Sequence, residues 1–292
     1  MKINYFFTFL FLTFFNYNGL IASKSVLIMT HSYNRPDFIE IQDKTFKKFL
    51  KDDYTFVVFN DAPQEEVANQ IIETCNRLNL PCIRIPQSIH DAPYLQRWPG
   101  EDYHHPCVRC ANVVQFSLNT LGFDRDRIVM IIDSDMFLVQ EFCVQEFLDG
   151  FSIAGVPQSR QHIEYIWNGL VFFNMQTLPD KKTIDFNCGQ VDEIHVDVGG
   201  QTYHYFKDHP EVMKNLIDNQ HYPSNFIVSE TTNENVKFLF SHGCNNFEFL
   251  LKNSFFHYRS GGNWNNKPKE YHEKKTAVLN AFIDKCISSI EF

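Results

Sequence analysis

The feature that most constrains the fold is an alternation of short, unbroken apolar runs with amphipathic segments in the first half of the chain. The segments that open at Pro36 and Pro63, and the one over residues 106–121, carry apolar side chains on one helical face. Short unbroken apolar runs are typical of strands buried on both faces of a parallel sheet. The alternation therefore predicts an α/β protein with a doubly wound, mostly parallel central sheet flanked by helices, and with ligands at the carboxyl ends of the strands. The four apolar runs cover residues 26–29, 56–59, 82–85 and 128–132.

The alternation fades after residue 140, where the second half of the chain becomes more mixed. Neither a linker-like change in composition nor an internal repeat interrupts residues 23–292. We expect a closing amphipathic helix over residues 276–290. The sequence thus predicts a single domain over residues 23–292, with a regular half over 23–139 and a mixed α/β half over 140–292. The short strands expected in the mixed half cover residues 153–156, 170–174, 237–240 and 254–258.

The first 22 residues differ from the rest of the chain. Lys2 precedes an almost continuous Phe/Leu run over residues 5–15, which polar residues and a glycine then interrupt. This layout is typical of a secretory signal peptide, and the run is shorter than the roughly 20 apolar residues of a membrane-spanning helix. A signal anchor stays open, because Leu20 stands where a cleavage site prefers a small residue. Both interpretations predict entry into the secretory pathway, either as an exported protein or anchored to a membrane with the domain outside the cytosol.

Size and charge exclude several classes of protein. The chain has 292 residues, of which 44% are hydrophobic and 21% charged, which excludes a disordered, collagenous or coiled-coil protein. Its net charge is −9 and it contains no Lys/Arg run, so binding of nucleic acid through phosphate neutralisation is not expected. A phosphorylated ligand would therefore need a metal ion or a few well-placed arginines.

Cysteines offer two interpretations. The chain has eight, which permits disulfides in an exported protein, but the spacing does not fix their pairing. Residues 104–110 read HHPCVRC and could supply zinc ligands, although a second Cys or His pair at finger spacing is missing. Cys107 and Cys110 fall on the same helical face as Val114, which favours cysteines of the core.

The clearest candidate site is Asp133-Ser134-Asp135, which directly follows the apolar run at residues 128–132. Residues i and i+2 of an extended strand point to the same face, so both carboxylates can reach one hard cation. A Walker-B aspartate is excluded, because the chain contains no GxxxxGK[ST] sequence. An aspartate nucleophile of the phosphatase type would normally follow the first strand, whereas this motif follows the fourth apolar run. A pair of surface acids in a turn is the remaining alternative, and the apolar residues 136–139 that resume at once argue against it.

With this motif in place, the sequence resembles the nucleotide-sugar glycosyltransferases of the GT-A fold, a Rossmann-like architecture. In that family a DxD after a buried strand holds a divalent metal, Mn²⁺ or Mg²⁺, on the diphosphate of the donor. The resemblance implies that residues 23–139 bind the nucleotide and that residues 140–292 bind the acceptor and complete the metal site. Ser134 lies between the two acids. The residues that the resemblance places on the nucleotide-sugar side are Thr30, His31, Arg35, Asp61, Arg109, Asn112, Asp133 and Ser134.

The same resemblance assigns the acceptor side to two segments that follow the DxD. Residues 167–174 read WNGLVFFN and look like the acceptor-side strand of the family, and residues 192–201 add acids and a flexible turn. An inverting enzyme needs a carboxylate base beside the acceptor hydroxyl, whereas a retaining enzyme does not require this placement, and the sequence leaves both open. Asp197 is our first candidate for the acid, with Asp192 and Glu193 as alternatives. The residues assigned to the acceptor side are Trp167, Asn168, Gly169, Gly200 and Gln201.

Residues 257–264, HYRSGGNW, resemble the C-terminal motif of the family. The resemblance implies that His257 completes the metal shell with Asp133 and Asp135. The chain departs from the glycogenin-like HxxGxxK pattern, because Gly261 comes one position late and Lys267 is also offset. The basic contact to the diphosphate is thus left open between Arg259 and Lys267, with Gly262 nearby.

The resemblance implies a metal-dependent enzyme that moves a sugar from a nucleotide-diphosphate sugar to a hydroxyl of a glycan, lipid or protein acceptor. Two other classes stay open. A nucleotidyltransferase also combines an α/β sheet with metal-binding acids, although residues 30–35 lack the glycines of its basic loop. A non-catalytic exported binding protein would have no need of both DxD acids, and both are present.

Overall fold

The structure is a computed structural model that describes residues 25–91, 106–263 and 266–289. The predicted leader at residues 1–22 lies outside the described residues, as do His104, His105 and Trp264. In the part of the chain that is described, no helix combines the length and apolar character needed to cross a membrane.

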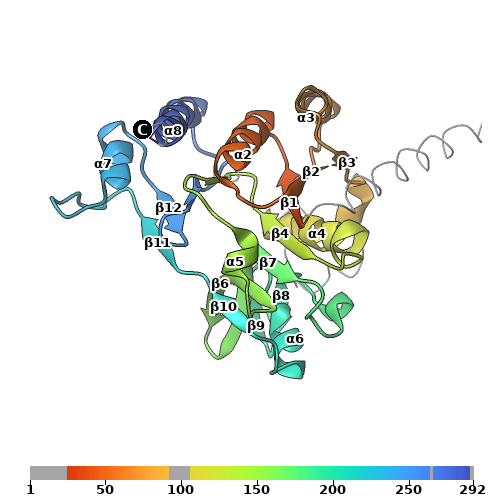
Figure 1. Ribbon diagram of the computed structural model, residues 1–292. Coiled ribbons are helices and arrows are strands. Elements are labelled where there is room, and N and C mark those ends of the chain that lie inside the picture. The colour runs from red at the N-terminus through yellow and green to blue at the C-terminus, as the bar shows by residue number, and fades with distance from the viewer. Residues whose placement is uncertain (1–24, 92–105, 264–265, 290–292) are drawn as a thin grey trace, which may run out of the picture.

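A seven-stranded sheet forms the centre of the protein, in the order β10-β6-β7-β4-β1-β2-β3 (Figure 1). Four of its six strand pairings are parallel, and β7 is antiparallel to both of its neighbours. The predicted mostly parallel α/β sheet is therefore confirmed. The strands are β1 (Val26–Ser32), β2 (Tyr54–Asn60), β3 (Cys82–Arg84), β4 (Ile128–Ile132), β6 (Ile153–Arg160), β7 (Ile163–Asn174) and β10 (Lys214–Leu216).

Helices cover both faces of this sheet, and strand alternation decides which side chain meets which helix. Ile28 of β1 packs in one core cluster with residues of α2 (Pro36–Phe49), α3 (Glu65–Leu78) and α8 (Lys269–Ser288). Its neighbours Leu27 and Met29 point the other way, into a second cluster with α4 (Pro106–Ser117). Helix α2 contacts both α3 and α8, and the three stand along the top of Figure 1. Helix α4 continues into a single π-helical turn, η3 (Leu118–Gly122).

A smaller antiparallel sheet lies beside the central one, in the order β11-β12-β13-β5. Only residues 133–135 separate the end of β4 from strand β5 (Met136–Leu138), so the segment that carries the DxD connects the two sheets. Strand β13 (Phe255–His257) pairs with β5, β12 (Phe247–Leu250) pairs with β13, and β11 (Asn219–Tyr222) forms the far edge. This sheet brings the C-terminal motif against the end of β4.

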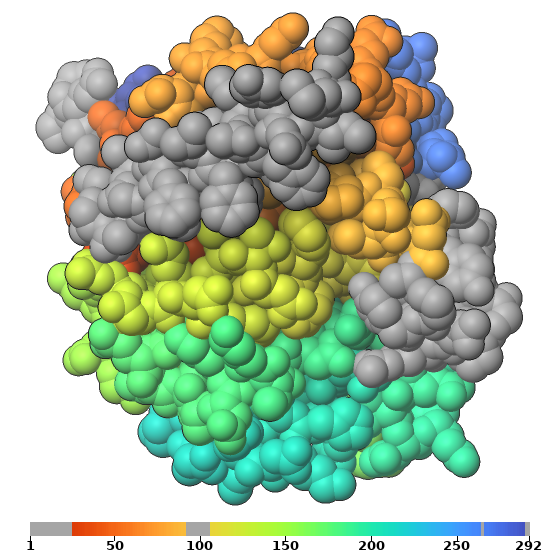
Figure 2. Space-filling view, turned by 90° about the vertical axis from the view of Figure 1, so that its right-hand side faces the viewer, coloured from red at the N-terminus to blue at the C-terminus, as the bar shows by residue number. Residues whose placement is uncertain are grey.

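Shorter elements complete the fold. Figure 2 shows one side of the molecule in bands, with α3 and β3 at the top, α4 below them, and the segments around β8, β9 and α6 at the bottom. The two halves of the chain thus lie one above the other on this side. The remaining elements are η1 (Gln87–Asp91), α5 (Val144–Phe147), η4 (Lys181–Thr183), β8 (Gly189–Val191), β9 (Ile194–Val196), α6 (Thr202–Asp208) and α7 (Glu234–Ser241).

Two expectations for the second half differ from the structure. Residues 237–240 belong to helix α7 and not to a strand, because Asn233 caps the helix N-terminus and Val236 and Leu239 form its buried stripe. The strand expected at residues 170–174 is the end of the much longer β7, which includes Trp167. The predicted closing helix is confirmed, although it begins at Lys269.

Candidate metal centre and surrounding site

The turn between β4 and β5 places the two acids of the DxD. The amide of Met136 donates to the carbonyl of Asp133 at 3.1 Å, and the amide of Asp133 donates to the carbonyl of Gly169 in β7 at 2.8 Å. From α2, the buried Gln42 Nε2 donates to the carbonyls of Asp133 (2.9 Å) and Met136 (3.0 Å). The polar backbone of this buried turn is thereby satisfied from both sides, which fixes the two carboxylates.

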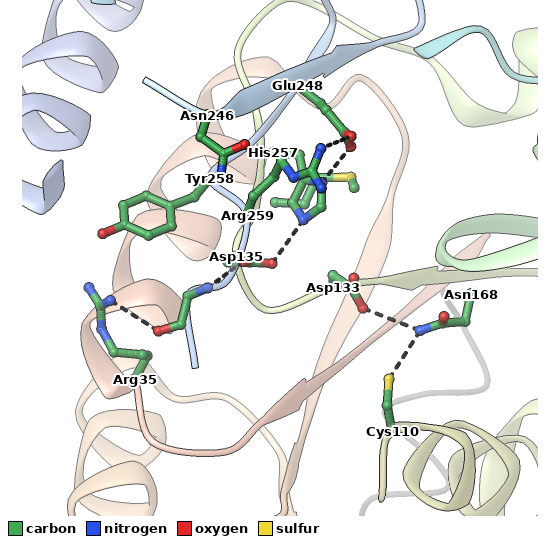
Figure 3. A network of polar contacts seen from close by, with 12 residues as sticks. Arg35, Cys110, Asp133, Asp135, Asn168, Asn246, Glu248, His257, Tyr258 and Arg259 are labelled. Atoms are coloured by element: carbon green, nitrogen blue, oxygen red, sulfur yellow. Dashed lines mark hydrogen bonds and ion pairs between the residues drawn. The ribbon is translucent and has the colours of Figure 1, made fainter. Parts of the chain in front are cut away.

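Three side chains predicted as metal ligands lie together at this turn. One ligand atom each from Asp133, Asp135 and His257 lies within 4.8 Å of the other two. His257 Nε2 is 3.3 Å from Asp135 Oδ1 (Figure 3). The pairing of β13 with β5 produces this contact, because it sets His257 opposite Met136. Among the described residues, this is the one group of three Asp, Glu, His or Cys side chains that could hold a metal ion.

Each of these three side chains has a further partner (Figure 3). Asp135 Oδ2 accepts a hydrogen bond from the amide of Gly261 at 2.7 Å. Asn168 Nδ2 donates to Asp133 Oδ1 at 3.4 Å, and His257 Nδ1 donates to Glu248 Oε2 at 2.9 Å. Such outer contacts orient metal ligands.

Gly261 is required where it contacts Asp135. A Cβ at this position would lie 2.6 Å from Asp135 Cβ and 2.6 Å from Phe38 Cε2, closer than carbon atoms pack. Only glycine therefore lets this amide approach the carboxylate. Arg35 supports the same loop, because its NH1 group donates to the Gly261 carbonyl at 3.4 Å while its remaining nitrogens bind Asp37 and Thr276.

The three ligand candidates perturb one another electrostatically. Burial, followed by the charge of Asp135, raises the pKa of Asp133 to about 7. Burial also raises the pKa of Asp135, but the charge and hydrogen bond of His257 outweigh it and hold that pKa below 3.8. Burial lowers the pKa of His257, yet Asp135 and Glu248 raise it to about 10. Without a cation, His257 is therefore protonated at neutral pH and supplies a positive charge directly beside Asp135.

Among the residues predicted to bind the nucleotide, Asp61 and Arg109 bind each other. Arg109 Nε donates to Asp61 Oδ2 at 2.7 Å, and His90 Nε2 lies 2.9 Å from Asp61 Oδ1. Gln87 completes the group, accepting from Arg109 at 2.7 Å and donating to Asp61 Oδ1 at 3.2 Å. Asn112 joins it through His90 Nδ1 at 3.3 Å. The predicted residues Asp61, Arg109 and Asn112 therefore lie together, but the carboxylate of Asp61 already accepts hydrogen bonds from protein side chains.

The remaining residues predicted to bind the nucleotide lie within β1 or shortly after β1 and β4. Thr30 is fully buried and its hydroxyl has no hydrogen-bond partner within the described chain. His31 Nε2 is 2.9 Å from Ser117 Oγ, and burial lowers the pKa of His31 to about 4, so its ring is neutral. Arg35 lies in the network with Asp37 described above, and Ser134 is half-buried between the two acids.

Of the residues predicted for the acceptor side, Trp167 lies against the cluster of Asp133, Asp135 and His257. Its ring centroid is 5.4 Å from that of His257. The ring also covers Gly169, where a Cβ would lie 2.0 Å from it. Gln201 is buried and donates to the carbonyl of Gln190 at 3.1 Å. Gly200 is buried against Val196.

The two candidate bases lie at opposite ends of the β8–β9 hairpin. Asp197 follows β9, and its Oδ1 accepts from the thiol of Cys107 (2.9 Å) and the amide of Val198 (2.8 Å). The charge of Asp197 contributes to the raised pKa of Asp133, so the two carboxylates interact. Asp192 occupies the hairpin turn with a φ of 47°, is half exposed, and lies 3.8 Å from His162.

The candidates for the diphosphate have different surroundings. Arg259 NH1 donates to Glu248 Oε1 at 2.5 Å. The carbonyl of Gly262 accepts from Asn34 at 3.1 Å, and Lys267 is exposed. Sequence reasoning missed Glu248, although one signal existed: it is the only charged residue within the apolar strand Phe247–Leu250. It also missed Gln42, His90 and Gln87, for which the sequence holds no comparable signal.

Comparisons with known proteins give similarity in structure only. No protein-family model matches the sequence, and no curated protein sequence matches it significantly. Among solved structures, the chain is similar to the galactosyltransferase LgtC, with 10% identity over 65% of this chain and 66% of that one and a TM-score of 0.37. It is also similar to the mannosyltransferase Ktr4p of S. cerevisiae, with 12% identity, 55% and 58% coverage and a TM-score of 0.39. In both cases the match spans less than two thirds of the other protein.

A third similar structure is the mannosyltransferase PcManGT of Pyrobaculum calidifontis, solved with GDP-Man and Mn²⁺. The identity is 10%, the match covers 91% of this chain and 73% of that one, and the TM-score is 0.42. At TM-scores below 0.5 these similarities do not identify a function, which has to be argued from the site.

Proposed function

We propose that the protein is a metal-dependent glycosyltransferase that moves a sugar from a nucleotide-diphosphate sugar to a hydroxyl acceptor. The observation that carries this proposal is the meeting of Asp133, Asp135 and His257 at the end of a central strand. The carboxyl ends of parallel strands are where α/β proteins bind their ligands. The site is also the place where the seven-stranded sheet and the four-stranded sheet meet.

The donor set fits Mn²⁺ or Mg²⁺. Two carboxylates are ligands that these hard cations prefer, and the imidazole nitrogen suits Mn²⁺ better than Mg²⁺, which is usually held by oxygen alone. A divalent cation held here would supply a Lewis acid that neutralises the diphosphate as it leaves. Since the chain carries a net charge of −9, the attraction of a diphosphate would depend on that cation.

Two buried polar groups among the residues expected to bind the nucleotide, one in β1 and one in α4, support a polar ligand there. The Thr30 hydroxyl oxygen and the Asn112 side-chain oxygen have no hydrogen-bond partner in the described chain. Buried polar groups in folded proteins are almost always satisfied, by protein, water or ligand. Both residues belong to the set expected on the nucleoside side, and a nucleoside would offer them donors.

Asp197 is proposed as the group that receives the proton of the acceptor hydroxyl. Both hydrogen bonds that its carboxylate accepts from the described residues go to Oδ1, so Oδ2 is the oxygen suited to this role. Trp167, which lies against His257, would give the sugar an apolar ring face. We further propose that residues 1–22 direct the protein into the secretory pathway, where a glycan, lipid or protein hydroxyl is the acceptor.

A panel of nucleotide-diphosphate sugars, with Mn²⁺ or with EDTA, tests the proposal. Thermal shifts identify the donor, and chromatography then identifies the product. Release of a nucleoside diphosphate that requires Mn²⁺ supports a glycosyltransferase. Release of pyrophosphate from a nucleoside triphosphate and a sugar phosphate would instead identify a nucleotidyltransferase. Binding of a donor without turnover, for every acceptor class offered, would identify a binding protein.

A further inference from the structure

Glu248 is an acidic residue in an apolar strand. It follows Phe247 and precedes Phe249 in β12, and both phenylalanines are buried. Only 12% of its own side chain is exposed. A carboxylate in such surroundings is costly unless it is paired. Glu248 is paired twice, since Oε2 accepts from His257 Nδ1 at 2.9 Å and Oε1 accepts from Arg259 NH1 at 2.5 Å.

The strand register fixes the pairing of Glu248 with His257. Glu248 stands directly opposite His257 in the β12–β13 ladder, so both side chains lie on the same face. His257 in turn stands opposite Met136, the residue after Asp135. The Trp167 ring lies 5.4 Å from the imidazole and restricts its rotation. The imidazole is thus held by Glu248 with its other nitrogen toward Asp135 (Figure 3).

This hydrogen bond decides which nitrogen of His257 can bind a cation. An ionised carboxylate only accepts hydrogen bonds, so His257 Nδ1 must carry a proton. In the neutral imidazole with Nδ1–H, the lone pair lies on Nε2. Nε2 is the nitrogen that faces Asp135 at 3.3 Å. Glu248 therefore selects the one tautomer of His257 that can act as a ligand beside Asp133 and Asp135.

Arg259 supports Glu248. Its guanidinium is about one third exposed, and the NH1 group offsets the charge of the buried carboxylate. The family resemblance suggests Arg259 as a contact to the diphosphate, whereas the described contacts commit NH1 to Glu248. An arginine held in this way acts on the cation site indirectly, through the position of Glu248 and then of His257.

We infer that Glu248 is a positioning residue for the metal ligand His257, and that Arg259 acts through Glu248. The inference rests on the proposed function, because it concerns the same cation site. Outer-sphere carboxylates that hold a metal-binding histidine typically contribute 10- to 100-fold to metal affinity. Glu248→Gln should weaken Mn²⁺ binding by about that factor, since its amide can donate to Nδ1 and thereby favour the tautomer with a protonated Nε2.

The test is a Mn²⁺ titration of the full chain, followed by calorimetry or by the EPR signal of unbound Mn²⁺. It compares wild type, Glu248→Gln, His257→Ala and the double variant. Glu273→Gln is the matched control, because it makes the same chemical change at an exposed position of α8. We expect a 10- to 100-fold loss for Glu248→Gln, no loss for the control, and no further loss when Glu248→Gln is added to His257→Ala.

Other outcomes separate the failure of this inference from failure of the proposed function. Equal Mn²⁺ affinity of wild type and Glu248→Gln would overturn the inference alone. If Glu248→Gln lowers the Mn²⁺ affinity equally in wild type and in His257→Ala, Glu248 only stabilises the fold. This result would also overturn the inference. A wild type that binds no Mn²⁺ would overturn both. If Glu248→Gln does not fold by circular dichroism, Glu248→Asp, which keeps the charge on a shorter side chain, takes its place with the same expected direction.

Discussion

His257 Nε2 lies 3.3 Å from Asp135 Oδ1, although the two residues belong to opposite halves of the chain. The contact depends on the antiparallel pairing of β13 with β5. Strand β5 belongs to the smaller sheet, and the DxD turn connects it to β4 of the central sheet. The imidazole therefore reaches the end of β4 on a regular strand and not on a loop. Functional groups carried on strands are held more precisely than groups carried on loops.

Metal affinity should increase with pH. Asp133, with a pKa of about 7, and His257, with a pKa of about 10, must both lose a proton before they can bind a cation. Below pH 7 two protons compete with the metal, and between pH 7 and 10 one does. We expect Mn²⁺ affinity to rise about 100-fold per pH unit in the first range and about 10-fold in the second. Calorimetry in buffers of different ionisation enthalpy measures the protons released; pH-independent affinity would contradict the expectation.

The metal-free protein should become less stable between pH 6.5 and 8. The pKa of His257 is raised from 6.5 to about 10 on folding, so its contribution is complete below pH 6.5 and is lost as pH rises toward 10. Asp133, raised from 3.8 to about 7, adds a loss in the same direction up to pH 7. We expect the free energy of unfolding, measured by urea with EDTA present, to fall by about 1–2 kcal/mol.

The pH window is chosen to avoid two groups that act in the opposite direction. Lys275, with a pKa lowered to about 8, stabilises the fold as pH rises above 8, and His31, lowered to about 4, does so between pH 4 and 6.5. His257→Gln should flatten the decline between pH 6.5 and 8. An unchanged decline in this variant would assign the effect to other groups.

Gly261→Ala should destabilise the protein and weaken metal binding. The added Cβ would lie 2.6 Å from both Asp135 Cβ and Phe38 Cε2, so the loop must move and its hydrogen bond to Asp135 must lengthen. We expect a loss of about 1–3 kcal/mol in the free energy of unfolding. Gly262→Ala is the matched control for stability, because its nearest neighbours would be 3.8 Å away. Equal effects of the two variants on unfolding would show that the close approach at Gly261 is unimportant.

Asp197→Asn should lower the turnover of the donor by about 100-fold or more while leaving donor affinity nearly unchanged. The change removes the charge but retains the shape and the Oδ1 acceptor for Val198. Steady-state rates give turnover, and calorimetry gives donor affinity. Near-normal turnover would mean that Asp197 only stabilises the turn in which it lies. Asp192→Asn would then be the variant to test.

Much of the fold could be predicted because several of its strands are short, unbroken apolar runs. The runs at residues 26–29, 56–59 and 128–132 are apolar on both faces and form β1, β2 and β4. Residues 238–240 are also apolar, but there the cap at Asn233 and the helical spacing of Val236 and Leu239 favour a helix. The apolar residues alone were ambiguous at that place, and the N-terminal cap with the buried helical face resolved the ambiguity.

The candidate site was predictable to the extent that its residues stand in short motifs. Asp133 and Asp135 are two positions apart after a strand, and they lie where the sequence placed them. The ion pair of Asp61 with Arg109 was not predictable, because it depends on how β2 and α4 meet. Glu248 could only be understood once the β12–β13 register was known, since that register sets it opposite His257.

The most direct test of the account is the affinity of the protein for a nucleoside diphosphate, measured by calorimetry with Mn²⁺ and again with EDTA. The nucleoside diphosphate is the one that the donor panel identifies. For wild type, we predict binding at least 10-fold tighter with Mn²⁺, because the cation links the diphosphate to Asp133 and Asp135. For Asp135→Asn, which keeps an oxygen acceptor for the amide of Gly261 but removes the charge, we predict no effect of Mn²⁺. Equal affinity of wild type with Mn²⁺ and with EDTA would contradict a metal-dependent transferase.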